Sequence, residues 1–72
     1  MTTSRTMRDI MTLLKLCGVT PEGGFVILTL VENAGAEREM WDWMTTQTVA
    51  PTENMILFKA MELDGQFLSE EL

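Results

Sequence analysis

The residue types that most often carry chemistry are scarce in this sequence. Cys17 is the only cysteine, and the chain contains no histidine. A nucleophilic cysteine needs a neighbouring base, and a zinc site needs several thiolate or imidazole ligands. Cys17 also falls on the apolar stripe of its predicted helix, where a small buried hydrophobe is the simpler interpretation. These residue types therefore predict neither a nucleophilic enzyme nor a bound metal.

The acidic residues do not form a convincing catalytic arrangement either. Paired carboxylates act as acid and base only when a cleft gives them opposed environments. The acids at Glu37, Glu39, Glu70 and Glu71 fit solvated helix faces instead, and 72 residues leave little room for a cleft. Asp64-Gly65 lacks the further acids of an EF-hand loop. We therefore expect no enzyme and no cofactor.

The pair Gly23-Gly24 has two interpretations. Backbone N–H groups at a helix N-terminus can hold a phosphate, but the chain lacks the glycine-rich motifs of nucleotide-binding loops, and the neighbouring Glu22 would repel an anion. The favoured interpretation is that these glycines allow another helix to approach closely.

The elements that must position all these residues are predicted to be helices. Apolar residues recur at helical spacing, and capping residues bound the segments, as at Thr20-Pro21. The predicted helices cover residues 6–17, 20–34, 36–47 and 52–63, followed by a short C-terminal tail. The expected fold is one all-α domain over residues 1–72, a compact bundle of about four short helices.

One segment leaves an alternative open. Residues 25–31, FVILTLV, are rich in β-branched side chains and could form a buried strand, which would make the fold α+β. Helix is favoured because no second strong strand is present to pair with it. The polar residues of this helix share one narrow face, so we expect it to be the most buried of the four.

The charge is unevenly distributed along the chain. The net charge is −6, with +2 in residues 1–18 and −8 in residues 19–72. An acidic body disfavours nucleic acid and anionic membrane as partners and favours a basic protein surface. The longest uncharged apolar stretch is too short to cross a bilayer, and a single free thiol fits the reducing cytoplasm.

Methionine and tryptophan suggest a binding role. The chain has seven methionines, and methionine and tryptophan are both over-used at binding surfaces. Trp41 lies about 100° from the apolar face of its predicted helix, so it is expected at the rim. The predicted partner-binding residues are Trp41, Glu37, Glu39, Asp42, Met40 and Met44. They suit a non-catalytic binding protein, such as a small acidic inhibitor of the phage or mobile-element anti-defence type, docked on a basic nucleic-acid-binding protein.

Two other functions remain open from the sequence. A chain of this size gains stability by oligomerisation, so it could be a self-associating structural or regulatory module that forms a homodimer. The basic N-terminal helix, with Arg5, Arg8 and Lys15, could instead serve a small DNA-binding regulator. Direct nucleic-acid binding is disfavoured because 25–31, the position of a recognition helix, carries no basic residue.

Overall fold

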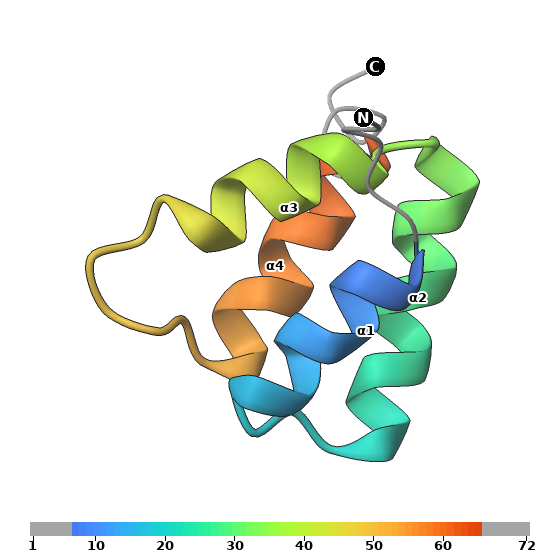
Figure 1. Cartoon of the computed structure of the whole chain (residues 1–72). Helices are drawn as coiled ribbons and strands as arrows, with labels where there is room; N and C mark the ends of the chain where they lie inside the picture. The colour runs from blue at the N-terminus through green and yellow to red at the C-terminus, as the bar shows by residue number, and fades with distance from the viewer. Residues whose placement is uncertain (1–6, 66–72) are drawn as a thin grey trace.

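Four α-helices make up the part of the chain that the structure describes, residues 7–65 of this computed structural model (Figure 1). They are α1 (Met7–Leu16), α2 (Pro21–Ala34), α3 (Glu37–Thr45) and α4 (Glu53–Leu63). The predicted all-α bundle is confirmed, with every helix boundary within two residues of its predicted position. The predicted C-terminal tail lies outside the described residues.

The alternative strand at 25–31 is wrong, because this segment forms the middle of α2. The Thr20 hydroxyl accepts a hydrogen bond from the Gly23 N–H at 3.1 Å and caps the helix, while Pro21 occupies its first turn. At the other end Gly35 adopts a left-handed conformation, and Ala36 N–H donates back to the Val31 carbonyl. These local start and stop signals outweigh the β propensity between them.

The turn between α1 and α2 is short, and it also ends a helix with a glycine in the left-handed conformation. Gly18 has a φ of 78°, which permits the Gly18 N–H to bond the Lys15 carbonyl and the Val19 N–H to bond the Leu14 carbonyl. This hydrogen-bond pair reverses the chain at a helix end, and an apolar contact usually accompanies it. Helices α1 and α2 therefore form a tight helical hairpin.

Every helix supplies two apolar residues, four positions apart, to a single core. The eight core residues are Ile10 and Leu14, Ile27 and Val31, Met40 and Met44, and Ile56 and Ala60. Residues at i and i+4 lie on the same helical face. Each pair therefore marks the face of its helix that points toward the core. No polar or charged residue is buried among residues 7–65, so the core depends on apolar packing.

Helix α2 makes its most extensive contacts with α4, while α1 packs against both α2 and α3. Two sides of α2 are thus covered, but the expectation that α2 is the most buried of the four helices is wrong, because each helix has two buried residues. Only Ile27 and Val31 are buried in it, and Phe25 and Val26 are exposed. Four short helices cannot surround one of their own members, so an all-round apolar helix must present an apolar face to solvent.

Within residues 7–65, no helix combines the length and the hydrophobicity that crossing a bilayer requires.

Candidate partner-binding groove

An apolar groove lies between α1 and α2. Its cavity volume is about 300 Å³. We call it the α1–α2 groove. Its lining consists of Met11, Leu14, Lys15, Val19, Thr20, Pro21, Gly24, Phe25 and Leu28.

The floor of the α1–α2 groove is built by the turn that joins the two helices. Leu14 is a buried core residue, and Val19 packs against the core. The backbone bond from Val19 N–H to Leu14 O, 3.0 Å long, holds these two side chains in register. Gly24 has no side chain, which leaves the space above Val19 and Leu14 open. The depth of the groove thus depends on one glycine and one helix-ending turn.

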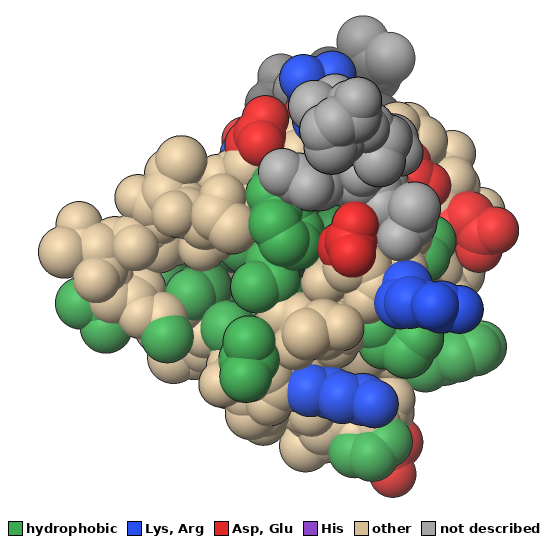
Figure 2. All heavy atoms as spheres, in the orientation of Figure 1, with side chains coloured by type: hydrophobic (Ala, Val, Ile, Leu, Met, Phe, Trp, Pro, Cys, Tyr) green, Lys and Arg blue, Asp and Glu red, His purple; other side chains and the backbone are tan. Residues whose placement is uncertain are grey.

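The rim carries exposed side chains of two kinds. Met11 and Phe25 are 40% and 74% exposed. Lys15 is exposed and, among the residues that the structure describes, is the only charged residue that lines the groove. Arg8 lies two turns before Lys15 on the same exposed face of α1. In Figure 2, basic and apolar side chains intermingle over α1 and α2.

The groove end near the interhelical turn is fixed by a contact with α4. Thr20 N–H donates to Glu53 Oε1, and the Thr20 hydroxyl donates to Glu53 Oε2, both at 3.0 Å. The Glu53 carboxylate thereby fills the N-terminus of α2, the place where a phosphate could have been held by Gly23-Gly24. A Cβ on Gly23 would collide with this carboxylate. The interpretation that the glycines admit a neighbouring helix stays a prediction, because the atoms next to Gly23 belong to the Glu53 and Thr20 side chains.

The predicted partner-binding residues on α3 divide into two groups. Met40 and Met44 belong to the core, and Met40 is fully buried. Their predicted place on a partner-binding surface is therefore wrong. The i, i+4 spacing that placed them together is the spacing of the inward face. Trp41 is half-buried and packs against the core, which fits the expected position at the rim of the apolar face but leaves its partner-binding role a prediction.

The acids of α3 stay at the surface. Glu39 and Asp42 are exposed, and Glu37 is half-buried. Arg38 is exposed between them, which reduces the net negative charge of this face. The structure therefore brings Glu39 and Asp42 to solvent without an exposed apolar anchor between them on the scale of Phe25.

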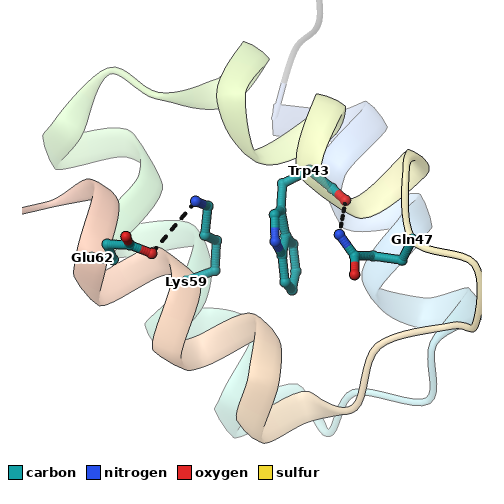
Figure 3. Close-up of polar contacts among 4 residues, drawn as sticks. All are labelled: Trp43, Gln47, Lys59 and Glu62. Atoms are coloured by element: carbon teal, nitrogen blue, oxygen red, sulfur yellow. Dashed lines mark hydrogen bonds and ion pairs between the residues drawn. The ribbon is translucent and has the colours of Figure 1, made fainter.

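The other tryptophan of α3 is also a packing residue. Trp43 projects from α3 toward α4 (Figure 3), and it packs against the core. Its carbonyl accepts a hydrogen bond of 2.8 Å from the Gln47 side-chain amide, which satisfies a backbone group at the end of α3. On the facing side of α4, Lys59 and Glu62 form an ion pair at 3.4 Å.

Cys17 and the acidic residues are expected to hold no metal ion, and the structure describes their placement within residues 7–65. No group of three or more cysteine or acidic residues there is arranged to hold a metal ion. Cys17 is free and half-buried, and it packs against the core. Polar side chains that line the groove are limited to Lys15 and Thr20, and the Thr20 hydroxyl already makes two hydrogen bonds.

Sequence reasoning missed the α1–α2 groove, although one signal was present. Helix α2 has apolar residues on more sides than its neighbours can cover, and Phe25 is the bulkiest of them. A helix of this kind in a four-helix chain predicts an uncovered apolar face. Its position could not be predicted, because it depends on which sides α1 and α4 occupy.

The fold and the groove together define a small all-α domain of four helices with an open apolar groove in its first helical hairpin. The sequence matches no protein-family model, and comparisons with curated proteins and with solved structures likewise find no match.

Proposed function

We propose that this chain is a non-catalytic protein-binding module whose α1–α2 groove receives apolar side chains of a protein partner. The observation that carries the proposal is the exposed Phe25 beside an apolar cavity of about 300 Å³. Aromatic residues and methionine are enriched in the cores of protein interfaces, and Phe25 and Met11 both border this cavity.

The energetics favour a partner on this rim. Complete burial of a phenylalanine side chain contributes about 1.5–3 kcal/mol, and Phe25 leaves most of that contribution unused in the isolated chain because it is 74% exposed. A partner that covers Phe25 and Met11 gains from both side chains at once. Leaving Phe25 and Met11 exposed in the isolated chain removes nothing from the core, because neither residue belongs to it.

The size and lining of the groove support a side chain as its occupant rather than a small-molecule cofactor. A volume of about 300 Å³ lies at the lower end of the range for small-molecule sites, which also contain several placed polar groups. Here only the Lys15 ammonium is available for such a role. A bulky side chain projecting from a protein surface fits this lining better.

The proposal can be tested by photo-crosslinking in cells that express the full chain. A photoreactive phenylalanine analogue replaces Phe25 in one variant and Phe58 in another. Phe58 is a matched control because it is also an exposed phenylalanine on a helix surface, at 63%. We expect a discrete protein adduct from position 25 that is absent from position 58, and that adduct partner, once purified, should bind the unmodified chain.

The proposal fails if position 25 gives the same adducts as position 58. An adduct of twice the mass of the chain would instead identify a second copy as the occupant, in agreement with the homodimer that the sequence left open. Sedimentation of the purified chain at micromolar concentration would then show a dimer.

A second candidate function rests on the exposed acids of α3. Glu39 and Asp42 are both exposed, and they could dock on a basic nucleic-acid-binding protein, as expected for an anti-defence inhibitor from a phage or mobile element. Replacing both with lysine should abolish partner capture if this face carries the binding. If partner capture survives this double change but is lost in Phe25→Ser, the α1–α2 groove rather than α3 is the binding site.

A cytoplasmic location is part of the proposal. Its support is Cys17, which is free and half-buried within the fold, because unpaired thiols persist in reducing compartments.

A further inference from the structure

We infer that the partner of the α1–α2 groove presents an amphipathic helix whose apolar face carries carboxylates at its edge. This inference rests on the proposed function and names the chemistry of the partner. Its observations are the two helices that border the groove, its apolar floor, and the cations Lys15 and Arg8 on α1.

The shape of the groove favours a helix. Two helices border it, and ridges of a third helix pack naturally into such a furrow. The groove is lined along α1 from Met11 to Lys15, about one helical turn, so one turn of a partner helix contacts it directly. Apolar residues at i, i+3 and i+4 of that turn would then face Leu28 and Phe25. Strand addition is not an option here, since residues 7–65 contain no strand edge to extend.

The charge of the rim favours acids on that helix. Lys15 lines the groove, and Arg8 extends the same exposed face of α1 by two turns. Among the residues that the structure describes, neither side chain makes an ion pair or hydrogen bond. Lys15 at the groove, with Arg8 further along the same face of α1, attracts a ligand that combines an apolar face with carboxylates.

The rest of the surface strengthens this selectivity. The chain as a whole carries a net charge of −6, and the exposed acids Glu39 and Asp42 lie on α3. An acidic partner helix is repelled by the exposed acids of this surface and attracted along α1, where Arg8 and Lys15 lie on one exposed face. Charge complementarity thereby fixes where the helix docks, while apolar burial supplies the affinity.

The test uses two synthetic peptides and the full chain. Both peptides are of about 16 residues with leucine and phenylalanine at i, i+3, i+4 and i+7, a spacing that gives one apolar helical face. One has glutamate at the flanking positions and the other has lysine. Binding is measured by fluorescence anisotropy. The acidic peptide should bind about tenfold more tightly, as expected for two solvent-exposed charge pairs, and the difference should shrink at about 1 M salt.

Variants assign the effect to named residues. The double variant Arg8→Glu, Lys15→Glu should reverse the preference in favour of the basic peptide. Arg38→Glu, which changes an exposed cation on α3, should leave the preference unchanged. Phe25→Ser should weaken both peptides, and Phe58→Ser should weaken neither. Circular dichroism confirms that each variant keeps its helical content.

Several outcomes overturn the inference. Equal binding of the two peptides, or a preference that survives the double charge reversal, removes the role of the α1 cations. Absence of binding by both peptides, alongside a protein adduct from position 25, rejects the amphipathic helix but leaves the proposed function standing. Absence of both binding and adduct rejects the two together.

Discussion

The Glu53 carboxylate closes the N-terminus of α2 by accepting two hydrogen bonds from Thr20, one from its backbone N–H and one from its hydroxyl, each at 3.0 Å. The two residues are 33 positions apart in the chain. A carboxylate at this place satisfies a free N–H group and also interacts favourably with the helix dipole. Because Thr20 also lines the α1–α2 groove, the contact ties the core helix α4 to one end of the candidate binding site.

Glu53→Ala should lower the free energy of unfolding by about 1–2 kcal/mol, since two hydrogen bonds to a charged group are lost at a partly exposed position. Glu22→Ala is the matched control. Glu22 also lies in the first turn of α2, so it shares the dipole interaction, worth about 0.3–1 kcal/mol, but not the bonds to Thr20. Urea denaturation of both variants measures the difference. Equal losses would mean that the hydrogen bonds to Thr20 contribute nothing beyond the dipole.

Gly23→Ala should separate the contact from helix propensity. An added Cβ displaces the Glu53 carboxylate, so the variant loses the bonds to Thr20 while it gains about 0.5–1 kcal/mol of helix propensity. In the Glu53→Ala background the collision is gone, and the same substitution should become stabilising. A double-mutant cycle with denaturant unfolding measures this change. A Gly23→Ala effect that is identical in both backgrounds contradicts the contact.

The fold was largely predictable because its signals are local. Thr20-Pro21 starts α2 and Thr52 caps α4, with its hydroxyl accepting from Met55 N–H, and both signals can be read in a few residues of sequence. The inward faces follow from i, i+4 spacing, as at Ile56 and Ala60. Helix existence and helix bounds depend on such short-range patterns.

The binding surface was not predictable in the same way. Helical spacing places Met40 and Met44 on one face of α3, and it places Phe25 and Ile27 on different faces of α2, but it does not say which face a neighbouring helix covers. That choice is made by tertiary packing, which buries Met40 and leaves Phe25 exposed. Trp41 shows the intermediate case, since a flank position becomes half-buried when adjacent helices lie close.

Met40→Ala should destabilise the fold strongly. Met40 is fully buried in the core, and truncation of a buried methionine costs about 2–5 kcal/mol, which could unfold a domain of this size. Met40→Leu, nearly equal in volume, should cost less than about 1.5 kcal/mol and keeps the comparison measurable. Met55→Ala is the exposed control, with an expected change within about 0.5 kcal/mol. If thermal unfolding shows that Met55→Ala destabilises the fold more than Met40→Ala does, the placement of α3 is contradicted.

Phe25→Ser should uncouple binding from stability. Phe25 is outside the core, so the free energy of unfolding should change by less than about 0.5 kcal/mol, while the photo-crosslinked partner and the acidic peptide should both lose most of their affinity. Phe58→Ser, on α4, should leave binding unchanged. The two variants are compared by urea denaturation and by anisotropy on the same preparations. Loss of binding in both variants would mean that exposed aromatics act non-specifically.

Gly24→Ala should stabilise the fold and weaken binding at once. A Cβ at this position lies 3.8 Å from Val19 Cγ1 and 3.9 Å from Leu14 Cδ1, which is ordinary packing distance, so the fold accepts it and gains about 0.5–1 kcal/mol of helix propensity. The same methyl group occupies the floor of the α1–α2 groove, so the acidic peptide should bind several-fold more weakly.

Opposite signs for stability and affinity would identify Gly24 as a residue retained for the depth of the groove rather than for the fold, a trade-off common at binding sites. Denaturant unfolding and peptide titration of one protein sample measure both signs. A Gly24→Ala variant that binds as tightly as the parent chain would show that the partner does not reach the floor, and would confine the contact to Met11 and Phe25 on the rim.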